Sequence, residues 1–145
     1  MVKKSTGARA LVDALLREKV EHVFGIPGTQ NLAILDELRC TPEIRFILTR
    51  HEQGAAFMAY GYARASGKPG IVTATEGPGV TNLATGIGAA NRGNVPVISI
   101  CGVQESVVRE RDSTQDMDQV TFMKPLTKWA YSIPNVGKVQ ELVRK

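Results

Sequence analysis

Cysteine and aromatic residues are scarce in this 145-residue chain, and long apolar runs are missing. The longest apolar stretches, such as residues 95–101, have the length of a strand and fall far short of the roughly 20 residues that cross a bilayer. Cys40 and Cys101 stand far apart, without the CxxC or Cys/His spacing of a metal site. We therefore expect buried reduced thiols, no metal site and no contact with a membrane.

The charged residues disfavour a nucleic-acid partner. The net charge is +4, but basic residues are scattered and interleaved with acidic ones, as in residues 109–112 (RERD). Aromatic side chains do not alternate with basic clusters as they do in proteins that bind single strands. The N-terminal Lys3 and Lys4 precede an amphipathic segment and no apolar signal sequence, which predicts a cytoplasmic protein.

Short apolar strands alternate with helices along the chain. The strands are expected at residues 22–26, 44–49, 71–75 and 97–101, and the helices at residues 8–19, 32–41, 51–66, 79–90 and 137–145. Strands without a two-residue period, separated by helices, are typical of a parallel sheet covered on both faces. The sequence therefore predicts an α/β fold, a three-layer doubly wound parallel sheet.

The length of the chain fits one domain, residues 1–145. Residues 104–118 are expected to form a polar connection. The last helix has no cap and no following strand, so we expect a domain truncated at its C-terminus.

The carboxyl ends of the strands are the expected functional edge, because ligands of doubly wound sheets bind there. Residues 77–82 (GPGVTN) lie at this edge but lack the third glycine of a dinucleotide loop, and Pro78 removes a backbone donor for a phosphate. Residues 61–68 have the wrong spacing for a P-loop. The glycines either make tight turns or let a flat ligand approach the backbone.

Residues 50–56 (RHEQGAA) place Glu52 at a strand-to-helix junction on the same edge. Glu52 is either a first-turn residue favoured by the helix dipole or a carboxylate that serves a ligand. His51 is likewise either structural or catalytic. The following helix carries small residues that let another helix approach, from this chain or from a partner subunit: Ala55, Ala56, Ala59, Gly61 and Ala63.

Six motifs in fixed order carry a resemblance to a known family. They are residues 25–28 (GIPG), 50–56 (RHEQGAA), 61–70 (GYARASGKPG), 77–82 (GPGVTN), 90–97 (ANRGNVPV) and 115–118 (QDMD). Together they resemble the aminopyrimidine-binding (PYR) domain of thiamine diphosphate (thiamine pyrophosphate, TPP) enzymes of the acetolactate synthase type. The resemblance covers nearly the whole chain.

The resemblance implies a role for five residues. Glu52 matches the carboxylate that hydrogen-bonds N1′ of the aminopyrimidine and so turns its 4′ nitrogen into a base beside the thiazolium carbon. Pro27 and Gly28 match a loop near the reactive end of the cofactor, and Asn82 matches a residue of the pyrimidine pocket. Gln115 matches a residue near the substrate.

The resemblance also implies an enzyme that decarboxylates and ligates 2-oxo acids in branched-chain amino acid biosynthesis and that forms a homodimer through its PYR domains. In this family Mg²⁺ holds the diphosphate through a Gly-Asp-Gly motif on a separate diphosphate-binding domain, in cis or on a partner chain. No Gly-Asp pair occurs in this sequence. The central domain, which carries FAD in true acetolactate synthases, is also outside it, so the isolated chain is expected to be inactive.

Two positions depart from the acetolactate synthase pattern. Thr29 stands where these enzymes usually have a second glycine, and Glu76 stands where they have serine. A PYR domain or subunit of a 2-oxo acid decarboxylase therefore remains an alternative, as does a non-catalytic α/β dimerisation module.

Overall fold

The computed structural model describes residues 6–104 and 113–145 and confirms the predicted α/β class. One parallel sheet, in the order β2-β1-β3-β4, is formed by β1 (His22–Gly25), β2 (Arg45–Leu48), β3 (Gly70–Ala74) and β4 (Val97–Cys101). The α-helices are α1 (Gly7–Arg17), α2 (Leu32–Arg39), α3 (Glu52–Ser66), α4 (Pro78–Arg92), α5 (Gln119–Met123) and α6 (Val139–Val143). Short 3-10 turns occupy Thr29–Asn31, Lys124–Leu126 and Val136–Lys138.

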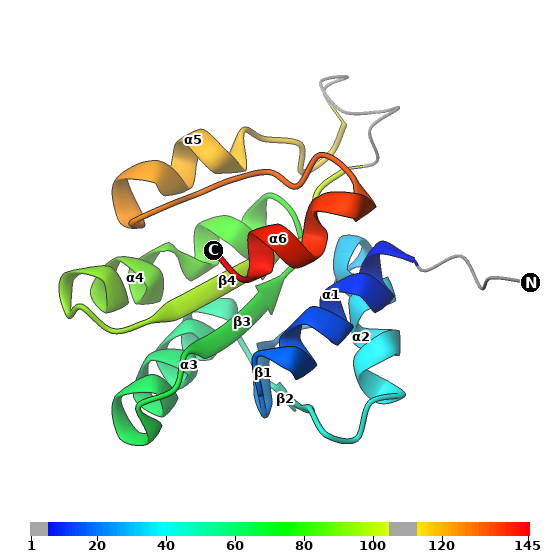
Figure 1. Ribbon diagram of the computed structural model, residues 1–145. Coiled ribbons are helices and arrows are strands. Elements are labelled where there is room, and N and C mark those ends of the chain that lie inside the picture. Colours follow the sequence, from blue (N-terminus) through cyan, green and yellow to red (C-terminus); the bar gives the residue numbers. More distant parts are fainter. Residues whose placement is uncertain (1–5, 105–112) are drawn as a thin grey trace, which may run out of the picture.

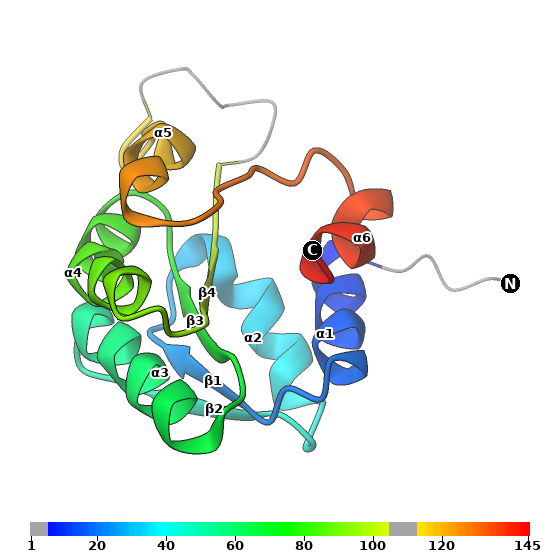
Figure 2. The ribbon, with the colours of Figure 1, turned by 60° about the vertical axis from the view of Figure 1, so that its left-hand side comes forward.

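Helices cover both faces of the sheet, as the three-layer prediction requires (Figures 1 and 2). Successive residues of a strand point to opposite faces. Val23 and Ile71 accordingly pack with α1, α2 and α6, whereas Phe24 and Val72 pack with α3, α4 and the Met123 side chain of α5. Each face therefore has its own apolar core, and the sheet separates the two.

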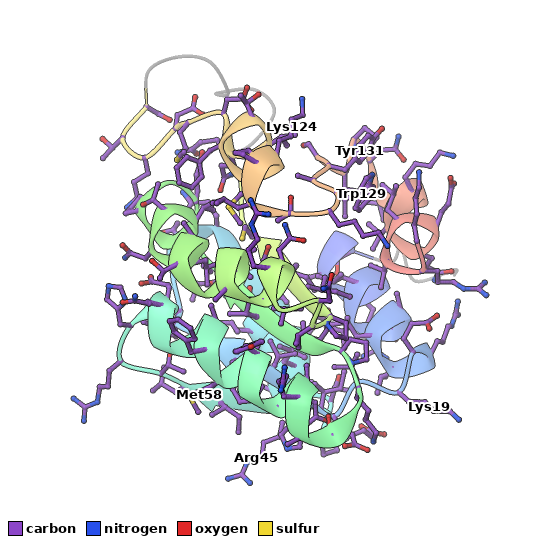
Figure 3. The ribbon with its side chains drawn as sticks, turned by 90° about the vertical axis from the view of Figure 1, so that its left-hand side faces the viewer. Lys19, Arg45, Met58, Lys124, Trp129 and Tyr131 are labelled. Carbon is purple, nitrogen blue, oxygen red and sulfur yellow. The ribbon has the colours of Figure 1, made fainter. Side chains whose placement is uncertain are left out.

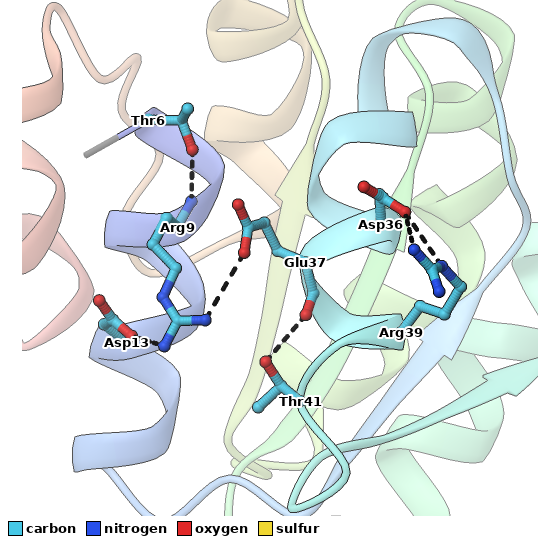
Figure 4. A network of polar contacts seen from close by, with 7 residues as sticks. All are labelled: Thr6, Arg9, Asp13, Asp36, Glu37, Arg39 and Thr41. Carbon is cyan, nitrogen blue, oxygen red and sulfur yellow. Dashed lines mark hydrogen bonds and ion pairs between the residues drawn. The ribbon is translucent and has the colours of Figure 1, made fainter. Parts of the chain in front are cut away.

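A polar network links α1 to α2 (Figure 4). The Thr6 hydroxyl caps α1 by accepting the Arg9 backbone N–H at 3.1 Å. The Arg9 guanidinium pairs with Asp13 at 2.7 Å within α1 and with Glu37 of α2 at 3.6 Å. Partly exposed pairs of this kind contribute under about 1 kcal/mol each, so the apolar core, rather than the ion pairs, holds the two helices together.

Helices α3 and α4 pack unusually closely on the other face. A Cβ atom on Gly86 of α4 would lie 2.5 Å from the Cβ of Ala56 in α3. The small residues predicted to receive another helix are buried within the chain at four positions, Ala55, Ala56, Ala59 and Ala63, while Gly61 is exposed. Ala56 receives α4 and Ala59 lies against Gly70 of β3, both within this chain, so these residues give no support for a contact between subunits.

Some local predictions were wrong. Cys40 is exposed rather than buried, because it directly follows α2 outside the packed layers. Cys101 is a free thiol whose pKa burial raises to about 12. Helix α5 was not predicted, and the last helix begins at Val139 because residues 136–138 form a 3-10 turn. Much of the expected polar connection 104–118 lies outside the described residues.

Within residues 6–104 and 113–145, every helix is too short or too polar to span a membrane.

Two glycines of α4 test the close packing against α3. Gly86→Ala should lower the free energy of unfolding by up to about 2.5 kcal/mol, because overpacking costs about 1–3 kcal/mol and the gain in helix propensity is roughly 0.5–1 kcal/mol. Gly88→Ala should instead raise it by about 0.5–1 kcal/mol, since a Cβ there meets only Leu126 Cδ2 at 3.6 Å. Urea unfolding measures both, and shifts of the same sign would contradict the assignment.

Candidate functional site

The carboxyl ends of the parallel strands meet at one edge of the sheet, and the predicted site residues lie along it. Pro27 and Gly28 follow β1, Glu52 begins α3 after β2, and Asn82 lies near the start of α4 after β3. The backbone of Gln115 comes within 2.4 Å of the position that a Cβ on Gly77 would occupy. Gln115 therefore packs against the loop that joins β3 to α4. The fold thus gathers residues from separate segments of the chain.

A hydrogen bond joins the two central residues of this edge. The Asn82 side-chain Nδ2 donates to Glu52 Oε2 at 3.0 Å, and both residues are half-buried. Within the described part of the chain this is the only hydrogen bond of the Glu52 side chain, which leaves Oε1 as an acceptor. Glu52 also lies in the first turn of α3, where the helix dipole favours a negative charge. The edge therefore presents a carboxylate that is fixed at one oxygen.

His51 has a structural role next to Glu52. It is the N-cap residue of α3, and its Nδ1 accepts the backbone N–H of Gln53 at 3.1 Å. An accepting Nδ1 carries no proton, so in this geometry the ring proton of a neutral His51 is on Nε2. The structure thus accounts for His51 without a catalytic role.

The loop after β1 packs tightly against the end of β3. A Cβ on Gly28 would lie 2.4 Å from the Cβ of Thr75, so only glycine fits there. The Thr75 hydroxyl donates to Gln30 Oε1 at 2.5 Å. Pro27, between β1 and this contact, is exposed. Packing within the chain therefore requires the glycine at position 28, and Pro27 is the residue that the loop presents outward.

The loop after β3 is constrained by its own glycine. Gly77 has a φ of +62°, a left-handed conformation that favours glycine, and the backbone of Gln115 closes over it. Gln115 itself has a φ of +81°, and its side chain is exposed. Glu76, one of the two departures from the acetolactate synthase pattern, is completely buried beside this loop. Gln115 and Glu76 are thus placed at the edge, one facing outward and one inward.

Sequence reasoning missed Gln30 and Asn31, which organise the β1 loop. Asn31 is completely buried, although asparagine before a helix ordinarily indicates an exposed cap. The available signal was the run of polar residues at 29–31 between an apolar strand and an apolar helix, which also fits an ordinary turn.

A large groove lies elsewhere in the described part of the molecule. A groove of about 1080 Å³ runs beside β4, between α4 and residues 126–133, and none of the five predicted site residues lines it. The described residues also contain no group of three or more His, Cys, Asp or Glu side chains that could hold a metal ion. The candidate site is therefore an open sheet edge with a fixed carboxylate.

Nearly the whole chain is similar to proteins of one known family. The family model "Thiamine pyrophosphate enzyme, N-terminal TPP binding domain" matches residues 5–122. The chain is 43% identical over 145 residues to the "Acetolactate synthase" of Arthrospira platensis, covering 98% of this chain and 25% of that protein. It is 42% identical over 141 residues to the "Acetolactate synthase" of Bacillus subtilis (strain 168), covering 97% and 24%.

A fungal relative is similar to nearly the whole chain as well. The "Acetolactate synthase catalytic subunit, mitochondrial" of Aspergillus candidus is 39% identical over 140 residues, covering 97% of this chain and 20% of that protein. The chain thus spans 20% to 25% of the length of these three relatives.

Substitution of His51 tests its capping role. His51→Ala should lower the free energy of unfolding by about 1 kcal/mol, because the Gln53 N–H loses its acceptor, whereas His51→Asn should retain or exceed the stability of the original chain. Chemical unfolding of the two variants measures the difference. Equal stability of the alanine and asparagine variants would show that the contact contributes nothing.

Proposed function

Because the chain belongs to the family of thiamine pyrophosphate enzymes, as an N-terminal TPP-binding domain, we propose that it supplies the aminopyrimidine half of the active site in an acetolactate synthase-like enzyme. In this proposal residues 1–145 are one PYR domain, and the substrates of the whole enzyme are 2-oxo acids. Its reactions are decarboxylation and carboligation, in branched-chain amino acid biosynthesis.

The hydrogen bond between Glu52 and Asn82 carries this proposal. Asn82 holds Oε2 of the carboxylate at 3.0 Å, and Oε1 is left to share a proton with N1′ of the aminopyrimidine. This arrangement suits a flat heterocycle. The carboxylate accepts a hydrogen bond, the amide is held in place, and the glycine loop lets a ring approach the backbone. When bound, thiamine diphosphate would supply the nucleophilic carbon that chemistry on a 2-oxo acid requires.

Neighbouring residues have supporting roles in the proposal. Pro27 and Gly28 form the wall next to the reactive end of the cofactor, and Gln115, which is exposed, reaches toward the substrate. Glu52 works by holding a proton at N1′, so its contribution depends on a fixed distance to that atom. The hydrogen bond from Asn82 supports this by restricting the rotation of the carboxylate.

Another surface must complete the site. Glu52, Asn82 and Gly28 are half-buried in this chain and Pro27 is exposed, so the edge is open to a second domain. We propose a diphosphate-binding domain, in cis or on a partner chain, that holds the diphosphate through Mg²⁺, a cation that prefers oxygen ligands. FAD belongs to the proposal only for a central domain of the acetolactate synthase kind.

The second candidate function is 2-oxo acid decarboxylation without carboligation. Thr29, in the β1 loop, and the buried Glu76, in the β3 loop, differ from the acetolactate synthase pattern at the edge itself. Thr29 and Glu76 would then act after carbon dioxide is lost, by favouring access of a proton over access of a second carbonyl compound to the bound cofactor. Product analysis of the assembled enzyme distinguishes the two.

Apolar side chains on the outside of α3 support the proposed homodimer. Phe57 and Met58 are exposed by 41% and 45%, and Leu48 at the end of β2 is exposed by 66%. Met58 lies on the side of α3 that faces away from α4 (Figure 3). We propose that this surface, rather than the small residues of α3, contacts a partner subunit.

Replacement of Glu52 tests the activating role. In the chain combined with its diphosphate-binding domain, Glu52→Gln should lower the rate of pyruvate decarboxylation by about 10²–10⁴-fold, because glutamine cannot hold the N1′ proton as a carboxylate does. The matched variant is Glu43→Gln, an exposed glutamate before β2 at the opposite edge of the sheet. Equal rates for the two variants would contradict the role of Glu52.

Cofactor binding is measured separately from catalysis, on the chain combined with its diphosphate-binding domain. A titration with thiamine diphosphate, monitored by NMR, should shift the backbone amide resonances of Gly28, Glu52 and Asn82 at lower cofactor concentrations than other resonances. Shifts confined to the groove beside β4 would place the cofactor elsewhere and overturn the proposed site.

The dimer surface is tested by a pair of charge substitutions. Met58→Glu should shift sedimentation toward the monomer, because a carboxylate buried in an apolar contact loses its hydration. Val136→Glu, at a residue of similar exposure (48% against 45%) in the turn before α6, should leave sedimentation unchanged. If both variants sediment as the unmodified protein does, α3 is not the contact surface.

A further inference from the structure

We propose that Asn31 is a positioning residue that fixes the backbone of residues 26–28, the loop that faces the cofactor. This inference rests on the proposed function, since it assigns that loop to the aminopyrimidine site. Asn31 lies outside the six motifs that carry the family resemblance. Its position before α2 suggests a helix cap, whereas we assign it the role of holding the preceding loop.

The side chain of Asn31 is turned away from the helix that it precedes. Asn31 is the N-cap residue of α2, a position where asparagine usually accepts a backbone N–H of the first turn, but its side chain makes no capping hydrogen bond to α2. It points back to Gly28 and closes the capping box of the 3-10 turn Thr29–Asn31. It is completely buried instead. Burying an amide is costly unless its donor and acceptor are both satisfied, so its partners indicate its role.

Both polar atoms of Asn31 are satisfied by the β1 loop. Nδ2 donates to the carbonyl of Ile26 at 3.1 Å, and Oδ1 accepts the N–H of Gly28 at 2.8 Å. The two bonds bracket Pro27, which has no backbone N–H of its own. One side chain therefore determines the path of three consecutive residues.

The bracketed loop is in turn fixed to its neighbours. Gln30 accepts the Thr75 hydroxyl at the end of β3, and Thr75 also fills the space against Gly28. A Cβ on Gly102, after β4, would lie 2.4 Å from the Cβ of Gln30, so the turn is wedged between two strand ends. Movement of residues 26–28 requires breaking the Asn31 bonds first.

An apolar residue at position 31 would leave two backbone groups without partners. The Ile26 carbonyl and the Gly28 N–H would both lose their bonds to the side chain, and buried backbone groups rarely remain unpaired. The loop would shift until water reached them. The cofactor would then have to order the loop when it binds. The free-energy cost of this ordering lowers the affinity for the cofactor.

The test compares Asn31→Leu with Thr41→Val in the full chain. Thr41 is also buried, and its hydroxyl donates to the Glu37 carbonyl at 2.8 Å at the far end of α2 (Figure 4). Each variant exchanges a buried polar side chain for an apolar one of similar size, but only Asn31 contacts the β1 loop. Gln30→Met, at a half-buried position, removes only the bond to Thr75 and serves as a second variant that keeps the core intact.

Two quantities are measured, the hydrogen-exchange rate of the Gly28 amide by NMR and the Kd for thiamine diphosphate of the chain combined with its diphosphate-binding domain. Asn31→Leu should speed the exchange and weaken binding by about tenfold, and Gln30→Met should weaken it less, while Thr41→Val leaves both quantities unchanged. Equal effects of Asn31→Leu and Thr41→Val on Kd would overturn the inference, as would unchanged exchange at Gly28 in both loop variants. Faster exchange in a variant that keeps its fold, together with no cofactor binding by the unmodified chain even when it is combined with its diphosphate-binding domain, would support the loop contact and reject the proposed function.

Discussion

The contact between Gly86 of α4 and Ala56 of α3 is the constraint on which the candidate site depends. Glu52 and Asn82 each lie four residues before one of these positions, on the same faces of the same helices. The distance between the helix axes at the small residues therefore sets the distance between carboxylate and amide one turn away, 3.0 Å. Bulkier residues would separate the helices and remove the donor from Glu52, so packing determines the chemistry available at this edge.

Hydrogen bonds between the ends of neighbouring strands make the rest of the edge rigid. The Thr49 N–H donates to the Gly25 carbonyl at 3.0 Å, joining the ends of β2 and β1, and the Gly102 N–H donates to the Ala74 carbonyl at 3.0 Å, joining β4 and β3. The bond from Thr75 to Gln30 joins the β1 loop to β3. Loops after strands are usually the mobile parts of an α/β fold, and here their first residues are held as part of the sheet.

Local signals were sufficient to predict the four strands, because each is a short apolar run that ends in turn chemistry, and they placed Glu52 at the correct edge. They could not predict the bond from Asn82, which lies 30 residues away and depends on how closely two helices approach. The alanines of α3 fit a contact within or between chains equally well, since both need small side chains. In the sequence, the position of Asn31 before an apolar helix indicates an N-cap residue of that helix. Only the packed loop shows that its side chain points back toward residues 26–28.

The half-buried state of Glu52 explains why a second surface matters to the proposed chemistry. In the chain alone, water competes with N1′ for Oε1, so a hydrogen bond there contributes little net free energy. A domain that covers the edge would exclude this water and lower the local dielectric constant, which strengthens a hydrogen bond to a carboxylate. The rigid edge supplies the geometry before that domain arrives, and the covering surface supplies the environment in which the geometry becomes effective.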